Sequence, residues 1–302
     1  MARAGEVTPL RRLAGWLAES PLLRRGKNLY EANCKHWNMQ LSRSEKLQAG
    51  LRLILRDYAA GLFPPRFEDR EATYRAEIEC SESLPGVTLE TAALADMQKP
   101  FWVGPRLRTY LRDFCLIHES LERCGILPPA RVLEMGCGFG WTSEFLAAIG
   151  YEVTGTSIAA SSIEWARKRI ASLEAKGLQR VLRFEVAPME SVAEDVGPKG
   201  YYDAVLVYEA LHHAFSWREA IQSAAECLKP GGWLLLCNEP NLVHTFSSYR
   251  VARLSNTHEI GLSRRELTAH MRQCGMTQFI NMGARLHFWI KPHWLCGRKA
   301  GG

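Results

Sequence analysis

A glycine-rich turn in the stretch VLEMGCGFGW is the strongest sign of a ligand site in this sequence. One acid, Glu134, precedes Gly136, Gly138 and Gly140 in the pattern E-x-G-x-G-x-G. Glycines let the backbone approach a ligand closely, and open α/β sheets bind ligands where their strands end. The dinucleotide fingerprint is G-x-G-x-x-G, whereas here the third glycine comes one residue early and Trp141 stands in its place. The spacing therefore disfavours NAD or FAD.

Two adjacent histidines, His212 and His213, follow the apolar run YDAVLVY. If that run is a parallel strand, its end lies at the same edge of the sheet as the glycine turn. Histidine is well matched to proton removal near neutral pH, so either residue is a candidate general base, with a slight preference for His213. The alternative is that both shape the loop or bond to backbone. The spacing Glu209-x-x-His212 lacks a convincing third ligand, so no metal site is predicted.

Short apolar segments alternate with amphipathic helices in the second half of the chain. The strand-like segments are RVLEM, YEVTGT, VLRFEV, YDAVLVY and GGWLLLC. Such alternation implies right-handed crossovers and a parallel sheet covered on both faces, which is a doubly wound, Rossmann-like α/β fold. The last segments, TQFINMG and RLHFWI, are joined by too few residues for a crossover, so we expect an antiparallel hairpin.

The first hundred or so residues carry helical patterns without this alternation. We therefore divide the chain into a helical N-terminal cap or substrate region, residues 1–104, and an α/β domain, residues 105–302. In the second region, NEPNLVHTFSSYRVARLSNTHEI is expected to be a long loop that forms a lid or a pocket wall. Its Arg250 and Arg253 are candidates for holding an acidic substrate group, and a solvated surface pair is the alternative.

Together these motifs resemble those of the class I S-adenosylmethionine-dependent methyltransferases of the small-molecule type. The glycine turn matches their first motif, and YEVTGTSIAASSIEWARKR is similar to their second strand and helix. YYDAVLVYEALHHAFSWREAI resembles their fourth strand, and CLKPGGWLLLCNEP their Lys-Pro-Gly-Gly turn and fifth strand. The resemblance covers roughly residues 105–291. It implies a seven-stranded, mainly parallel sheet with an antiparallel last strand, and S-adenosyl-L-methionine as cofactor.

The same resemblance assigns roles to individual residues. Glu134 would face the ammonium of the methionine moiety, and the turn would let the backbone approach the cofactor. Ser157 stands where the family usually has a ribose-binding acid, and Met189 is expected to pack on the adenine. Tyr110 would lie near the methionine end, although a core aromatic is the equal alternative. The predicted cofactor-binding residues are Glu134, Gly136, Cys137, Gly138, Gly140, Ser157, Met189, Tyr208 and Tyr110.

Composition indicates an ordinary globular protein. The nine cysteines form no C-x-x-C pair, which favours reduced thiols in a cytoplasmic protein. The net charge is +6, and the basic residues are scattered along the chain. No apolar run is long enough for a signal peptide or a membrane span. Leu10, Leu13, Trp16 and Leu17 could share one helical face beside arginines. A helix packed on its own protein is favoured, and a weak peripheral membrane contact is the alternative.

The sequence therefore predicts an S-adenosylmethionine-dependent methyltransferase with a small-molecule acceptor. O-methylation of a metabolite, a sugar or a lipid-linked precursor is favoured. Nucleic acid is disfavoured as a substrate because YEALHH stands where enzymes that methylate base amines carry an Asn- or Asp-Pro-Pro-aromatic motif. Two alternatives remain: a non-catalytic protein that binds S-adenosylmethionine or S-adenosylhomocysteine, and, less favoured, an NAD-dependent oxidoreductase.

Overall fold

A computed structural model describes residues 8–23, 42–65, 67–82, 88–101, 107–178, 181–282 and 292–301 of the chain. The chain divides into two compact units. The helical unit comprises Met1–Gly86 and Leu242–Gly261, and the sheet unit comprises Val87–Asn241 and Leu262–Gly302. The domain boundary that the sequence predicts, after residue 104, stays a prediction. The boundary between the two compact units instead follows Gly86, and the helical unit also includes Leu242–Gly261.

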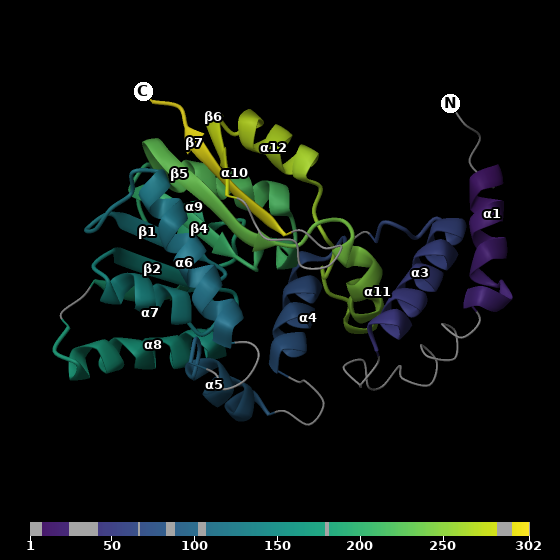
Figure 1. The fold of residues 1–302 in the computed structure, drawn as a ribbon, viewed down its shortest axis with the longest axis horizontal. Helices are drawn as coiled ribbons and strands as arrows, with labels where there is room; N and C mark the ends of the chain where they lie inside the picture. Colours follow the sequence, from purple (N-terminus) through teal and green to yellow (C-terminus); the bar gives the residue numbers. More distant parts are fainter. Residues whose placement is uncertain are drawn as a thin grey trace. The chain divides into compact units, whose positions relative to one another are not determined.

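The sheet unit contains seven strands in the order β3-β2-β1-β4-β5-β7-β6. Figure 1 shows them side by side with helices on both sides. The strands are β1 (Arg131–Met135), β2 (Glu152–Ser157), β3 (Leu182–Val186), β4 (Tyr202–Tyr208), β5 (Leu228–Glu239), β6 (Met276–Asn281) and β7 (His293–Lys299). Strands β1 to β5 pair in parallel, and β7 runs antiparallel to both β5 and β6. The predicted seven-stranded, doubly wound sheet with an antiparallel last strand is thus confirmed.

Alternate side chains of the central strands β1, β4 and β5 enter opposite cores, because successive residues of a strand face opposite sides of the sheet. Val132, Leu206 and Leu235 belong to one core and Leu133, Val205 and Leu234 to the other. Both faces of these central strands are therefore apolar and covered, as their near-continuous apolar sequences predict.

Helices supply the other half of each core. The first core receives side chains from α6 (Leu107–Arg123), α7 (Trp141–Ala148) and α8 (Ala160–Ala175). The second receives them from α9 (Val192–Asp195), α10 (Trp217–Cys227) and α12 (Arg264–Gln273). The unit also contains α5 (Leu89–Met97) and the short 3-10 helix η1 (Leu211–His213). No described helix is long and apolar enough to cross a membrane.

The helical unit contains α1 (Pro9–Ala18), α3 (Arg43–Ala60), α4 (Arg70–Glu82) and α11 (His244–Ser255). The segment predicted as a long loop therefore contains a helix, α11, and that expectation was wrong. Tyr249 and Arg250 of α11 are buried, and the Tyr249 hydroxyl donates to Asp57 of α3 over 2.9 Å. Arg253 is 3.0 Å from the same Asp57 carboxylate, so these side chains hold α11 on α3.

The predicted terminal hairpin is correct in type and wrong in position. Strands β6 and β7 pair antiparallel, but β7 is the segment HWLCGRK. The segment RLHFWI lies outside the described residues. His293 and Trp294 are buried in β7.

Candidate functional site

The glycine turn joins β1 to α7, and each of its glycines has a left-handed φ. A side chain at Gly136 would place its Cβ 2.4 Å from Cβ of Ala210, which follows β4. At Gly140 it would meet the ring of Phe184 at 2.6 Å. Gly138 differs, because nothing lies within 4 Å of the position that its Cβ would take. The outer two glycines are thus needed for packing, and the middle one borders open space.

Glu134 is buried under this turn, with 2% of its surface exposed. Its carboxylate accepts a hydrogen bond from the hydroxyl of Ser143, in the first turn of α7. Burial raises its pKa to about 7 even though hydrogen bonds from Ser143 and Thr142 oppose the shift. The hydrogen bond between Glu134 and Ser143 therefore links β1 to the start of α7. A contact with the cofactor ammonium stays a prediction.

We expect Glu134→Gln to stabilise the protein in a pH-dependent way. Since the folded-state pKa of Glu134 is raised, the native carboxyl holds its proton from about pH 4.5 to 7, where the unfolded chain has released it. The stability of the wild type should therefore fall with pH across this window relative to that of the variant. The difference in the free energy of unfolding between variant and wild type should reach about 3 kcal/mol at pH 8. Urea unfolding at pH 5 to 8 measures it, with exposed Glu185→Gln as control. A gap that stays constant with pH would contradict the assignment.

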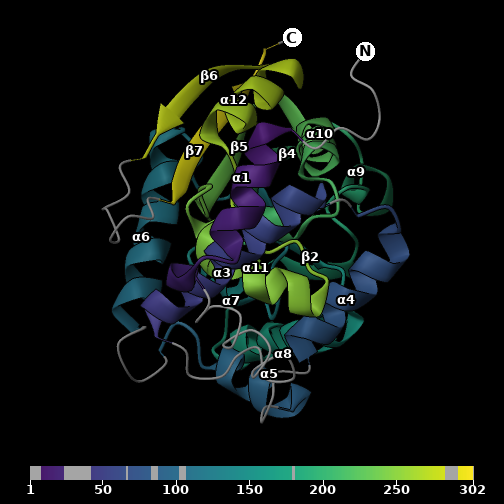
Figure 2. The ribbon, with the colours of Figure 1, turned by 90° about the vertical axis from the view of Figure 1, so that its right-hand side faces the viewer.

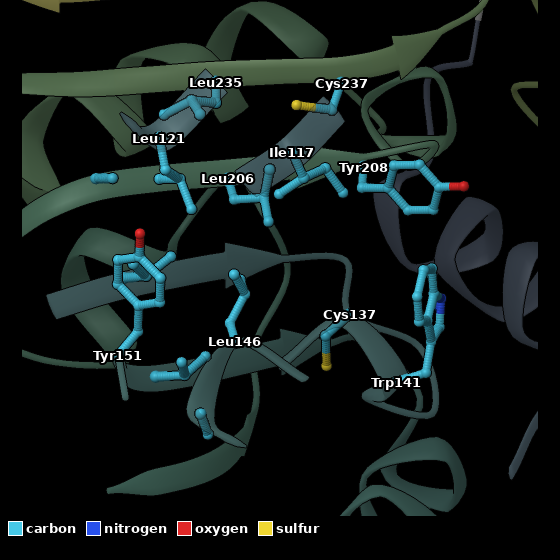
Figure 3. Packing of buried hydrophobic residues seen from close by; sticks show 14 of the residues in the cluster. Ile117, Leu121, Cys137, Trp141, Leu146, Tyr151, Leu206, Tyr208, Leu235 and Cys237 are labelled. Atoms are coloured by element: carbon cyan, nitrogen blue, oxygen red, sulfur yellow. The ribbon is translucent and has the colours of Figure 1, made fainter. Parts of the chain in front are cut away.

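An aromatic cluster lies beside the turn. The ring of Trp141 packs edge-on at 5.8 Å from Tyr110 of α6 and at 5.9 Å from Tyr208, the last residue of β4. Figure 3 shows Trp141 and Tyr208 close together at one end of the strands, with Tyr151 at the opposite end. Two predicted cofactor residues, Tyr110 and Tyr208, are thus brought together by Trp141. All three rings are almost fully buried, and Lys99 lies 5.3 Å over the ring of Tyr110.

Polar residues meet at the carboxyl ends of β4 and β5. The Tyr208 hydroxyl donates to the Asp113 carboxylate of α6 over 3.1 Å, and the amide of Asn238 donates to the same oxygen over 3.2 Å. Asn238 also donates to Glu209. Glu209 is exposed, but the protein around it displaces part of its solvent, and this desolvation raises its pKa. The negative charges of Asp113 and Glu239 raise its pKa further.

His212 is held by Glu239, the last residue of β5. Its Nδ1 lies 3.0 Å from Oε2 of Glu239, which is fully buried. The other carboxylate oxygen accepts the backbone N–H groups of Ala210 and Leu211 over 2.8 and 3.0 Å. Burial opposes ionisation of Glu239, but its hydrogen bonds outweigh burial and lower its pKa. His213 is half-buried, with its ring 4.1 Å from that of His212.

The remaining predicted residues lie around the same edge. Cys137 is buried in the turn, and its backbone N–H donates to the carbonyl of Thr156 on β2 over 2.8 Å. Ser157 ends β2, and its hydroxyl accepts the N–H of Ala159 over 3.3 Å. Met189 follows β3, and its methyl would lie 3.5 Å from a Cβ on Gly136. These three residues therefore come from the turn and from the ends of two neighbouring strands.

Sequence reasoning did not identify Asp113, Asn238 and Glu239 as site residues. One signal was available for Asp113, which lies on the apolar stripe of its helix at helical spacing with Tyr110 and Ile117. A charge on such a stripe needs a buried partner. Asn238 and Glu239 directly follow the apolar run of β5, where ligand-binding residues of parallel sheets gather.

A comparison with protein families matches residues 108–277 to a family described as a methyltransferase domain. Among curated proteins, the ubiquinone biosynthesis O-methyltransferase of Bordetella avium is 32% identical over 164 residues, which are 51% of this chain and 65% of that protein. The corresponding protein of Hydrogenovibrio crunogenus is 30% identical, over 56% of this chain and 70% of that protein. The chain thus spans about two thirds of the length of these relatives.

Solved structures agree on the fold. The YcgJ protein of Bacillus subtilis has a TM-score of 0.50 at 18% identity, over 63% of this chain and 99% of that one. A putative sarcosine dimethylglycine methyltransferase from Galdieria sulphuraria also has a TM-score of 0.50, at 17% identity, over 61% of this chain and 69% of that one. At these identities the likeness concerns the fold alone. Because the family match, residues 108–277, covers more than half of the chain, this protein belongs to the class I S-adenosylmethionine-dependent methyltransferases.

Proposed function

We propose that this protein transfers a methyl group from S-adenosylmethionine to a hydroxyl of a small molecule. The observation that carries the proposal is the His212–Glu239 pair. Glu239 also binds the N–H of Ala210, which packs against Gly136 of the glycine turn. The relatives named as ubiquinone biosynthesis O-methyltransferases support a hydroxyl acceptor, and make ubiquinone precursors the first candidates.

The residues present fit the cofactor of the family. Gly138 borders open space and has a φ of +53°, so its backbone can be approached without obstruction from a side chain. Ser157 and Met189 lie at the ends of neighbouring strands, where a hydroxyl and a thioether can contact ribose and adenine. Ser157 replaces the usual acid with a neutral group, and a neutral hydrogen bond is about half as strong as a charge-assisted one. We therefore expect the affinity for S-adenosylmethionine to depend strongly on the glycine turn.

Once bound, S-adenosylmethionine supplies a methyl group that is already activated on a sulfonium. The protein then has to align the acceptor oxygen and remove its proton. We assign proton removal to His212. If its Nδ1–H is donated to Glu239, the basic lone pair is on Nε2, and the carboxylate stabilises the imidazolium that forms. The three backbone N–H groups held by Glu239 fix the loop that carries this histidine.

Methyl transfer from radiolabelled S-adenosylmethionine tests the function. The acceptor panel should contain phenols, catechols, sugars and lipid-linked quinol precursors, with amines of similar size as the comparison. Labelled ether products would support the proposal. Labelled amines would move the reaction to nitrogen, and cofactor binding without any labelled product would favour the non-catalytic alternative.

We expect His212→Ala to lower kcat by about 10²–10⁴-fold toward the acceptor that the panel identifies, the usual contribution of general acid–base catalysis. The Kd for S-adenosylmethionine should change by less than about threefold, because His212 removes a proton from the acceptor. The control is His213→Ala, expected to retain at least about a tenth of the activity. If His213→Ala causes the larger loss, the base is His213, the residue that the sequence slightly favoured.

A further inference from the structure

Helix α1 presents an apolar face to solvent. Its small residues Ala14 and Ala18 are buried, Gly15 approaches Ala59 of α3, and Glu19 forms an ion pair of 2.8 Å with Arg52. These contacts place α1 along α3, as Figure 2 shows within the helical unit. The small residues Ala14, Gly15 and Ala18 therefore lie on the side of α1 that packs against the rest of the helical unit.

The large apolar side chains of α1 point away from that contact. Leu10, Leu13 and Trp16 are exposed by 66%, 52% and 69%, and Leu17 is exposed as well. Leu10, Leu13 and Leu17 follow helical spacing, and Trp16 borders them, so all four lie on one side of the helix. Leu22, which follows the helix, is also exposed. A contiguous apolar surface of this kind marks an interaction site.

Basic residues flank this surface. Arg11 and Arg12 are exposed on α1. Glu19 is the sole acidic residue between positions 8 and 27 of the sequence, and it is already paired with Arg52. The surface therefore combines leucines, a tryptophan and unbalanced positive charge, which suits anionic headgroups above acyl chains.

A second copy of the chain fits less well. In a symmetric contact each apolar face would meet its own copy, which would bring Arg11 and Arg12 close to the same arginines of the partner. Anionic lipid neutralises these charges, and Trp16 has the amphipathic ring that is enriched at membrane interfaces. We propose that α1 docks this protein on an anionic lipid surface through Leu10, Leu13, Trp16 and Leu17. This inference does not depend on the proposed acceptor.

Sedimentation of the full chain with vesicles tests the proposal. We expect binding to vesicles of phosphatidylcholine with a quarter phosphatidylglycerol, and at least tenfold weaker partitioning onto phosphatidylcholine alone or in 0.5 M salt. The double variant Leu13→Ser, Trp16→Ser should reduce partitioning onto the anionic vesicles at least tenfold. Arg11→Gln, Arg12→Gln should also weaken it, while leaving the apolar face intact.

The matched control is Phe101→Ser, Leu127→Ser. These two residues of the sheet unit are 65% and 57% exposed, so the control removes one aromatic and one leucine of similar exposure. It should bind the vesicles as the wild type does. Failure of the wild type to bind, or equal losses in control and α1 variants, would overturn the proposal. A dimer in light scattering that is lost in the α1 variant, without vesicle binding, would assign the surface to a second copy.

Discussion

Gly138→Val is expected to lower the affinity for S-adenosylmethionine and for S-adenosylhomocysteine at least about 100-fold. The space beside this residue is open, so a branched side chain would occupy the region from which a ligand approaches the turn. A 100-fold loss corresponds to about 2.8 kcal/mol, which is reasonable for closing one side of a cofactor site. Calorimetric titration of both ligands into wild type and variant measures the change directly.

The matched control for this variant is Gly177→Val. Gly177 follows α8, has a φ of +72° and, like Gly138, has nothing within 4 Å of its Cβ position. Both variants therefore carry the backbone strain of a branched residue in the left-handed region. Loss of binding in both would mean that strain alone is responsible. Full binding by Gly138→Val would show that the cofactor does not approach this turn, and would remove the basis of the proposed site.

The sheet could be predicted because its strands are buried on both faces. Segments such as RVLEM and YDAVLVY are short, continuous apolar runs bounded by glycine or by polar residues, and they became β1 and β4 with the predicted bounds. The local sequence is sufficient to predict a strand when nearly every position of the segment is buried. The antiparallel last strand followed from the resemblance and from the shortness of the final connection.

The last strand was misplaced because two neighbouring segments both satisfy a strand pattern. RLHFWI and HWLCGRK each mix apolar, aromatic and basic residues. The choice of HWLCGRK depends on pairing with β5, where Leu295 lies opposite Leu236 and Cys296 opposite Leu235. The same limitation applies to α11, whose polar composition indicates a loop. There Tyr249 gains a buried partner, Asp57, that is far away in the sequence.

The location of the candidate site was predictable, but its contacts were not. The rule for parallel sheets placed the glycine turn and the His212 segment at one edge of the sheet. The structure is consistent with that rule, because a Cβ on Gly136 would lie 2.4 Å from Cβ of Ala210. Asp113 reaches Tyr208 across 95 residues of sequence, and Glu239 reaches His212 across 27. Such pairs depend on how helices and strands pack, which no local pattern encodes.

Glu239→Ala is expected to lower the free energy of unfolding by at least about 3 kcal/mol at pH 7. The fully buried carboxylate accepts the N–H groups of Ala210, Leu211 and His212, and each buried donor left without an acceptor costs about 1–3 kcal/mol. Urea unfolding measures the loss. The matched control is Glu226→Ala, since the pKa of Glu226 is also lowered, but by an ion pair with Lys199 at the surface. An exposed pair contributes at most about 1 kcal/mol.

The pH dependence separates the charge of Glu239 from its packing. Because its pKa is lowered in the folded protein, ionised Glu239 contributes stability above the unfolded-state pKa of about 4.3, and that stability is lost as the pH falls through the folded-state value. The gap between wild type and Glu239→Ala should therefore narrow below about pH 4. A gap that stayed constant down to pH 3 would mean that lost packing dominates. The carboxylate would then not be the group that orders the His212 loop, and the assigned role of His212 would lose its structural support.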